Sequence, residues 1–222
     1  LLHLDQPILE INITPDRGYA FSYRGVAREY HHSTGAKFVD PVTELNKRAP
    51  AAPAVESGVS SDIEVIVDDN NPIHGVTGCD RYVARAIHGF DPTNHTPNWM
   101  RRRLIRAGMR SISLAVDVTN YVMLDLGQPM HAYDLDKIEG PIVVRRAAEG
   151  EKLTTLDGKE HDLSVEDLLI TDSPDGKRGS RILGIAGVMG GLYGEVTADT
   201  KNILLEACLL YTSPSPRDST SS

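Results

Sequence analysis

The chain has 222 residues, of which 40% are hydrophobic and 24% are charged, and these proportions are ordinary for a soluble globular protein. Its length accommodates one medium domain with an appended piece, or two small domains. The formal net charge of −8 argues against binding of nucleic acid through a broad basic surface. No apolar run approaches the roughly 18 residues that a membrane-spanning helix needs, so we predict no membrane association.

The chain contains only two cysteines, Cys79 and Cys208, and neither has a second cysteine near it in the sequence. No zinc-ligand spacing is therefore present, and we predict no metal site. A disulfide between the two stays open, but a reducing cytosol is the simpler interpretation, so we predict a cytoplasmic protein. The sequence begins Leu-Leu-His, without a methionine or a signal-peptide pattern, which suggests a piece of a longer chain.

The N-terminal segment predicts a small strand–turn–helix unit. Residues 9–13 alternate apolar and polar side chains, which favours a half-buried strand, and residues 14–18 predict a turn. Ser22 is placed to cap a helix that Gly35 ends. One face of that helix carries Tyr23, Val26, Ala27 and Tyr30. Such a unit is too small to bury a core alone, so we assign residues 1–38 to the C-terminal part of a larger N-terminal domain.

Prolines and small residues mark residues 48–61 as a linker, and we predict the linker to span residues 39–61. The main domain is predicted over residues 62–208. The tail, residues 209–222, ends in a serine- and proline-rich stretch with almost no apolar content, so we predict it to be disordered and not native sequence.

Within residues 62–208, alternating side chains predict strands at 63–67 and 82–87. A helix is predicted to begin with Thr96 as its cap and Pro97 as its first residue, and to end at Gly108. Its apolar stripe consists of Trp99, Met100, Leu104 and Ala107. Residues 116–131 predict a short strand, a helical turn that ends near Gly127, and a loop.

Asp157 and Gly158 predict a tight hairpin turn. Alternation in the last strand places Ile203, Leu205 and Ala207 on one face and Leu204 and Glu206 on the other. Many strands with few helices and no regular βαβ alternation predict an α+β fold with mixed or antiparallel sheets. The further strands are predicted at residues 142–145, 153–155, 168–171, 182–186 and 203–207.

A group of arginines is the best candidate for a local contact with RNA. The alternative, which charge alone favours, is the solvated face of a helix. The group consists of Arg101, Arg102, Arg103, Arg106 and Arg110.

Residues 117–131 concentrate Thr119, Asn120, Gln128 and His131 around a turn-rich stretch. Such side chains could line a pocket and hold a water molecule or an ester. The alternative is that Thr119 and Asn120 cap a helix and that His131 is an ordinary surface or core histidine, which is the commoner role of a single histidine.

Residues 186–191 are rich in glycine, which lets a backbone turn sharply or approach a ligand closely. A phosphate-binding loop is excluded, because no Lys-Ser/Thr pair follows and the glycine spacing fits neither nucleotide motif. A structural turn is the alternative.

Glu206 lies among apolar residues in the last predicted strand. A carboxylate is costly to bury unpaired. Glu206 therefore either faces water or has a dedicated partner, and the pattern alone does not choose between the two.

Residues 116–134 (VDVTNYVMLDLGQPMHAYD) closely resemble a signature of the bacterial phenylalanyl-tRNA synthetase β subunit. Residues 186–191 (AGVMGG), followed by residues 200–207 (TKNILLEA), resemble a second part of that family. Residues 13–17 and 24–29 look like the segment that precedes its editing domain. The four motifs occur in the order of the family, and the resemblance covers roughly residues 5–208.

The resemblance implies an editing domain that hydrolyses tyrosine wrongly attached to tRNA(Phe). His131, Asn120 and Thr119 match the catalytic pocket that receives the ester and the terminal adenosine. Gly187 and Ala186 match positions that line the amino-acid side of the pocket. Glu206 matches the glutamate that recognises the tyrosine hydroxyl, and no metal ligand is implied.

The resemblance also implies a parent α2β2 ligase that uses ATP, magnesium, phenylalanine and tRNA(Phe), with aminoacylation mainly on the α subunit. This chain would need neither ATP nor a metal of its own. Two other hypotheses remain: a non-catalytic scaffold or tRNA-binding module, and a free-standing hydrolase. Set against the family pattern, we expect the oligonucleotide-binding fold that precedes this region to be missing, and the tail after Cys208 departs from that pattern.

Overall fold

The computed structural model describes residues 7–48, 63–69 and 77–210. Contacts divide the chain into two compact units. The first comprises Leu1–Ala54 with Asp91–Met130, and the second comprises Val55–Phe90 with His131–Ser222. Residues 91–130 therefore group with the N-terminal part of the chain, although they are far from it in sequence. The predicted boundaries near residues 38, 61 and 208 remain a proposal.

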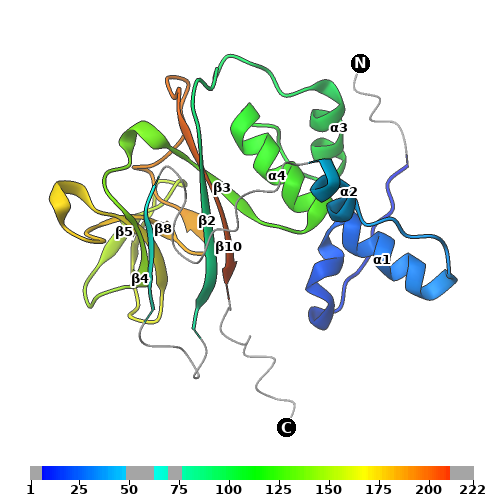
Figure 1. Cartoon of the computed structure of the whole chain (residues 1–222), viewed down its shortest axis with the longest axis horizontal. Coiled ribbons are helices and arrows are strands. Elements are labelled where there is room, and N and C mark those ends of the chain that lie inside the picture. The colour runs from blue at the N-terminus through cyan, green and yellow to red at the C-terminus, as the bar shows by residue number, and fades with distance from the viewer. Residues whose placement is uncertain (1–6, 49–62, 70–76, 211–222) are drawn as a thin grey trace, which may run out of the picture. The chain divides into compact units, whose positions relative to one another are not determined.

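The first unit is helical in its described part (Figure 1). The strand predicted at residues 9–13 is wrong: these residues form neither helix nor strand, and Leu9 is 82% exposed. Alternation alone does not make a strand, because the backbone also needs a partner to pair with. The elements are the 3₁₀ helix η1 (Pro15–Phe21), α1 (Tyr23–Thr34), α2 (Pro41–Arg48), α3 (Asn98–Arg106) and α4 (Leu114–Leu126).

Both predicted ends of α1 are confirmed. The Ser22 side chain accepts a hydrogen bond from the Gly25 amide, and Gly35 closes the helix with φ +72°. The predicted apolar face is not buried in this unit, since Tyr23 and Tyr30 are both more than half exposed. Gly25 is the buried residue of the helix. The backbone of η1 packs so closely there that a β-carbon at position 25 would lie 1.9 Å from the Tyr19 carbonyl oxygen.

The strand predicted within residues 116–131 is also wrong. Ser113 caps α4, and Gly127 ends it with φ +82°, so one continuous helix replaces the strand and helical turn. The buried Asp117 carboxylate accepts hydrogen bonds from the Ile112 amide and the Thr96 hydroxyl, which fixes the start of α4. Thr96 therefore does not cap α3 as predicted, and Pro97 takes the cap position without a side-chain bond.

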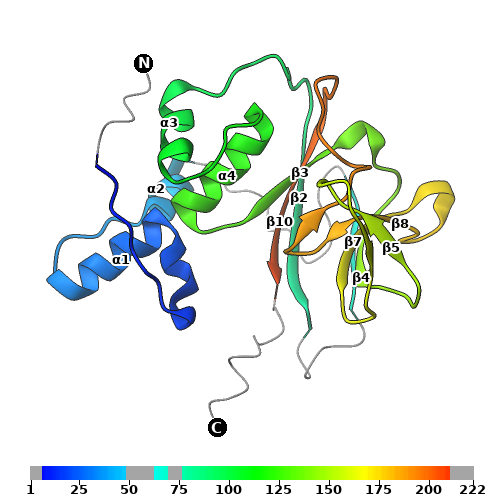
Figure 2. The ribbon, with the colours of Figure 1, turned by 180° about the vertical axis from the view of Figure 1, so that it is seen from behind.

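Three sheets form the described part of the second unit (Figures 1 and 2). β1 pairs with β4 in parallel, and β4–β7, β7–β8 and β8–β9 are antiparallel, so the five-stranded sheet is mixed. The second sheet has the order β2-β10-β3, and the third is the hairpin β5-β6. The strands are β1 (Val65–Asp68), β2 (Cys79–Ile87), β3 (Met130–Asp134), β4 (Ile142–Arg146), β5 (Lys152–Thr154), β6 (Glu160–Asp162), β7 (Leu168–Asp172), β8 (Arg181–Ile185), β9 (Met189–Gly190) and β10 (Ile203–Leu210).

The predicted α+β class is confirmed. The structure adds α2 in the first part of the predicted linker, β3 in place of a predicted loop, and the short strand β9. The predicted last strand, β10, runs on to Leu210, two residues into the predicted tail. The remaining linker residues, 49–61, and residues 211–222 lie outside the described part. The added strands β3 and β9 have five residues or fewer, too few for a local pattern to predict, so tertiary pairing defines them.

One hydrophobic core joins the two larger sheets of the second unit. Tyr82 of β2, Tyr133 of β3 and Leu204 of β10 pack in the same cluster as Ile142 of β4 and Ile170 of β7. All five residues are at most 9% exposed. This core surrounds the inner face of β10, which is the face that carries Glu206.

Candidate functional site

Glu206 is a buried carboxylate on the inner face of β10. The predicted alternation holds along residues 204–207, since Leu204 is 0% and Glu206 is 6% exposed whereas Leu205 and Ala207 are only half-buried. β10 pairs with β2 in a register that places Ala84 opposite Glu206 and Tyr82 opposite Cys208. Of the two interpretations of Glu206 from the sequence, the one with a dedicated partner holds.

Three side chains hydrogen-bond to Glu206. The Tyr82 hydroxyl donates to Oε2 at 3.1 Å, and the Cys208 thiol donates to Oε1 at 3.5 Å. The Tyr133 hydroxyl is the third partner. Burial, followed by the charge of Glu206, raises the pKa of Tyr82 well above its usual range, so this hydroxyl remains a proton donor at all physiological pH values.

His131 and Tyr133 lie on the same face of β3 because they are two residues apart. Their rings meet edge-to-face with centroids 4.5 Å apart. Burial, the Glu206 charge and a hydrogen bond to Glu206 raise the pKa of Tyr133 well above its usual range. Burial lowers the pKa of His131 below its usual 6.5, and the Glu206 charge only partly opposes this effect. The imidazole is therefore neutral at pH 7, which is the form that can accept a proton.

The glycine-rich segment lies against this group. A β-carbon on Gly190 would lie 2.7 Å from both Cε1 and Nε2 of His131, so the imidazole rests directly on the Gly190 backbone. Gly187 has φ +70°, a conformation that favours glycine, and Leu210 of β10 lies beside it. Ala186 packs against the core that contains Tyr82 and Tyr133. The segment forms a turn and the short strand β9, so the structural-turn interpretation is correct for its backbone.

The structure places four of the six predicted site residues in the second unit: Ala186, Gly187, His131 and Glu206. Thr119 and Asn120 belong to the first unit, on α4. Thr119 is buried, and its hydroxyl donates to the Val116 carbonyl one turn earlier at 2.9 Å. Neither residue caps the helix, because Ser113 does so.

Sequence reasoning missed Tyr82, Tyr133 and Gly190 as members of this group. The signal available was weak, because a tyrosine in a predicted strand is an ordinary core residue. Only the β2–β10 pairing, across 124 residues of sequence, brings Tyr82 to Glu206.

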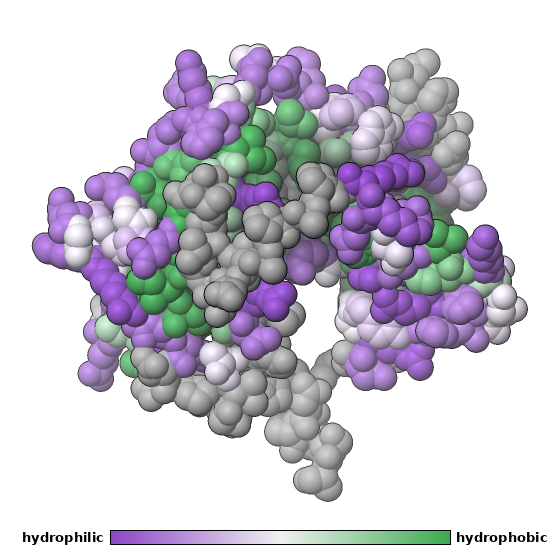
Figure 3. Space-filling model, in the orientation of Figure 1, coloured by the Kyte–Doolittle hydropathy of each residue, from purple (hydrophilic) through white to green (hydrophobic). Residues whose placement is uncertain are grey.

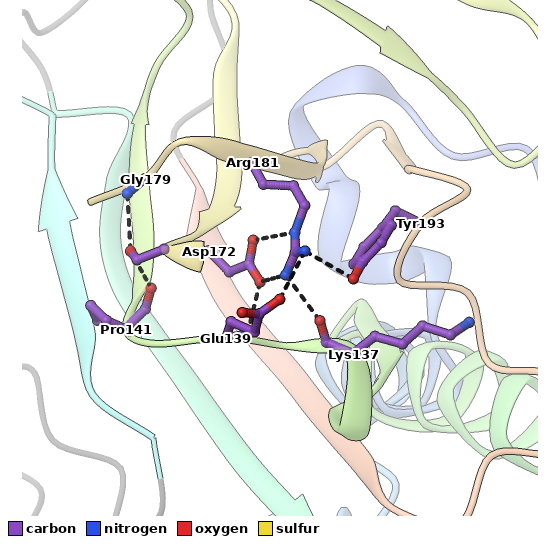
Figure 4. Close-up of polar contacts among 8 residues, drawn as sticks. Lys137, Glu139, Pro141, Asp172, Gly179, Arg181 and Tyr193 are labelled. Atoms are coloured by element: carbon purple, nitrogen blue, oxygen red, sulfur yellow. Dashed lines mark hydrogen bonds and ion pairs between the residues drawn. The ribbon is translucent and has the colours of Figure 1, made fainter. Parts of the chain in front are cut away.

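A second polar cluster in the same unit surrounds Arg181 (Figure 4). Its guanidinium donates to both carboxylate oxygens of the fully buried Asp172 and to Glu139, the Tyr193 hydroxyl and the Lys137 carbonyl. An arginine has five N–H donors. All five are used within the protein, so the Arg181 guanidinium stabilises the fold and has no N–H group left for a ligand.

The arginine group predicted from the sequence lies on and just after α3. Arg103 stacks on the rings of Trp99 and Tyr121, with its guanidinium carbon 5.6 and 5.8 Å from their centroids. It also donates to the Tyr121 hydroxyl. Arg106 donates to the Pro7 carbonyl at 2.9 Å. These two residues therefore pack within the unit, so they are more than a solvated face.

Hydrophobic side chains are also exposed around the glycine-rich segment. Figure 3 shows that the surface mixes hydrophobic and hydrophilic residues. The exposed hydrophobic residues near this segment are Leu156, Val188, Met189, Leu192 and Tyr193.

Every helix among the described residues is too short or too polar to cross a lipid bilayer.

Comparison with known proteins identifies the family to which the chain belongs. The model of the B3/4 domain matches residues 78–214, which is more than half of the chain. The phenylalanine–tRNA ligase β subunit of Bifidobacterium longum is 82% identical over 207 residues, covering 93% of this chain and 24% of that protein. The corresponding subunits of Leifsonia xyli and Streptomyces avermitilis are 51% and 48% identical, and each match covers 93% of this chain and 23% of the relative.

The chain thus spans about a quarter of the length of these relatives. Among solved structures, an N-terminal fragment of the phenylalanyl-tRNA synthetase β subunit from Pyrococcus horikoshii matches with 19% identity and a TM-score of 0.48, covering 88% of this chain and 54% of that one. The chain belongs to the B3/4 domain family, in a region that matches the β subunit of phenylalanine–tRNA ligase.

Proposed function

We propose that this region hydrolyses tyrosine wrongly attached to tRNA(Phe), as the editing part of a phenylalanine–tRNA ligase β subunit. The parent enzyme is a cytoplasmic α2β2 ligase that attaches phenylalanine to tRNA(Phe) with ATP and magnesium. Those two cofactors belong to the ligation step, and this region needs neither for ester hydrolysis. The partners are tRNA(Phe) and the α subunit, and the editing domain comprises residues 62–208.

The single observation that carries the proposal is the Glu206 carboxylate, buried at 6% exposure within an apolar core. Its three protein partners, Tyr82, Cys208 and Tyr133, leave about one acceptor position, because an ionised carboxylate accepts about four hydrogen bonds. A buried acceptor with unused lone pairs is what a site needs in order to recognise a hydroxyl group.

Tyrosine differs from phenylalanine by one hydroxyl, and an apolar synthetic pocket rejects such an addition by only about 100-fold. A second site that accepts a hydrogen bond from the hydroxyl can separate the two far more strongly, because phenylalanine leaves the buried acceptor without that partner. Glu206 is the proposed acceptor. Gly187 and Ala186 are proposed to lie beside the amino-acid ring, where larger side chains would intrude.

The proposed reaction is ester hydrolysis. Water adds to the carbonyl carbon, the bond from that carbon to the ribose oxygen breaks, and the proton released by water passes to the ribose oxygen. The products are tyrosine and uncharged tRNA(Phe). The neutral imidazole of His131 can orient the water or accept its proton. Thr119 and Asn120 are proposed to hold the ester and the terminal adenosine.

The proposal is tested by deacylation of tyrosyl-tRNA(Phe) and phenylalanyl-tRNA(Phe) with the full α2β2 enzyme. Wild type is expected to hydrolyse the tyrosyl ester selectively, and Glu206→Gln is expected to lose at least about tenfold of that preference. Glu195→Gln makes the same chemical change at an exposed position and should leave the preference unchanged. If wild type releases both amino acids equally, the proposal is wrong.

A non-catalytic structural or tRNA-binding module is the second candidate. The donors to Glu206 favour it, because a buried glutamate bonded to Tyr82 and Cys208 also ties β2 to β10. In that case Glu206→Gln lowers the melting temperature of the protein, while deacylation of the tyrosyl ester is the same as in wild type.

A further inference from the structure

We propose that Tyr82 is a positioning residue for the hydroxyl-recognising site, because its phenol holds the Glu206 carboxylate in the orientation that a substrate hydroxyl meets. The inference rests on the proposed editing function and adds a residue to it. The Tyr82 hydroxyl lies 3.1 Å from Glu206 Oε2 in a buried contact between two strands.

The strand register explains how this contact arises. Tyr82 lies opposite Cys208, and Cys208 is two residues from Glu206 on the same face of β10. Tyr82 is therefore a diagonal neighbour of Glu206, a relation that a long aromatic side chain can bridge. Both side chains project from paired strands into the core, so the contact depends on the backbone of the sheet rather than on a mobile loop.

The contact matters because of which lone pairs it occupies. Tyr82 takes one position on Oε2, and the Cys208 thiol, a weaker donor, takes one on Oε1. Tyr133 also hydrogen-bonds to Glu206, so roughly one acceptor position then remains. Tyr82 lies on β2 and Tyr133 on β3, the two strands that flank β10, so Glu206 is bonded from both neighbouring strands. These bonds hold the carboxylate in one rotamer, and the unused lone pair then points in one direction.

Loss of the Tyr82 hydroxyl leaves the acceptor present but less well oriented. Recognition needs groups held close to the productive geometry by neighbours that are themselves fixed. Tyr82→Phe should therefore lower the preference for the tyrosyl ester by about tenfold, which is the typical worth of one hydrogen bond to a charged group. Slow hydrolysis of the phenylalanyl ester should not change, because that substrate makes no bond to Glu206.

The experiment measures single-turnover deacylation of both esters by the α2β2 enzyme. The variants are Tyr82→Phe, Glu206→Gln, the double variant and Tyr193→Phe. Tyr193→Phe removes the same kind of hydroxyl, but the Tyr193 hydroxyl contacts Arg181 and not Glu206. The preference of this variant for the tyrosyl ester should therefore equal that of wild type. In the Glu206→Gln background, Tyr82→Phe should change the preference by less than about twofold, because the two residues act through one acceptor.

The outcomes separate the inference from the function on which it rests. If wild type fails to distinguish the esters, the proposed function is wrong. If wild type and Glu206→Gln behave as expected but Tyr82→Phe keeps full preference, the role of Tyr82 is wrong. Effects that multiply in the double variant also contradict it. A general loss of structure would instead reduce hydrolysis of both esters and the rate of aminoacylation.

A second pair of variants applies if Tyr82→Phe fails to fold. Position 82 can carry p-aminophenylalanine, which keeps a donor at the para position, or p-methylphenylalanine, which has similar bulk and no donor. The first should retain most of the preference, and the second should lose it by about tenfold. Equal preference in the two variants would overturn the inference.

Discussion

The contact between Gly190 and His131 gives the sharpest test of the proposed catalytic role. In Gly190→Ala, the new β-carbon would lie 2.7 Å from Cε1 and Nε2 of the imidazole and 3.3 Å from Leu156 Cδ1. Ordinary van der Waals contact begins at 3.4 Å, so the ring has to move by about 0.7 Å. A displacement near 1 Å at a reacting group costs on the order of 100-fold in rate. We expect the rate of tyrosyl-tRNA(Phe) deacylation to fall about 10- to 100-fold.

The assay is single-turnover deacylation by the α2β2 enzyme, with aminoacylation as a measure of intact folding. Gly18→Ala is the control, because a β-carbon there meets nothing within 4 Å. In a His131→Ala background, Gly190→Ala should have almost no further effect, since the group that it displaces is gone. A wild-type rate for Gly190→Ala, or an equal loss in both backgrounds, would refute a catalytic role for His131.

Three further predictions follow from the burial and contacts of single residues. Arg181→Met should lower the free energy of unfolding by about 3–5 kcal/mol in urea titrations, because it leaves the buried Asp172 carboxylate uncompensated, whereas the exposed Arg178→Met should cost less than about 1 kcal/mol. The pKa of His131 is lowered from 6.5 by burial, so the unfolded state binds the proton first as pH falls. Stability should therefore decline from pH 6.5 down to the folded-state pKa, and a His131→Asn variant should lack that part of the decline in thermal melts. Burial raises the pKa of the Cys79 thiol to about 11, so iodoacetamide at about pH 8 should leave it unmodified in the native protein, as mass spectrometry can show. Rapid alkylation of native Cys79 would contradict the buried position.

Most strands of the second unit were predictable because their pattern is local. The alternation around Glu206 and the turn at Gly158 predict β10 and the β5–β6 hairpin from a few neighbouring residues. The errors occurred where the outcome depends on partners. Residues 9–13 alternate but pair with no strand within the described part. From residue 116 on, the predicted short strand and helical turn are one helix, which the Ser113 cap and the buried Asp117 define.

The sequence by itself determined the family, the α+β class and the identity of Glu206 and His131 as candidate site residues, because motif order and strand alternation are properties of neighbouring residues. Only the tertiary structure decided that Glu206 is buried with Tyr82 as its donor, and that His131 rests on Gly190. These contacts join residues 124 and 59 positions apart, and no local pattern specifies them. They exist because the β2–β10 register and the turn before β9 bring separate segments onto one core.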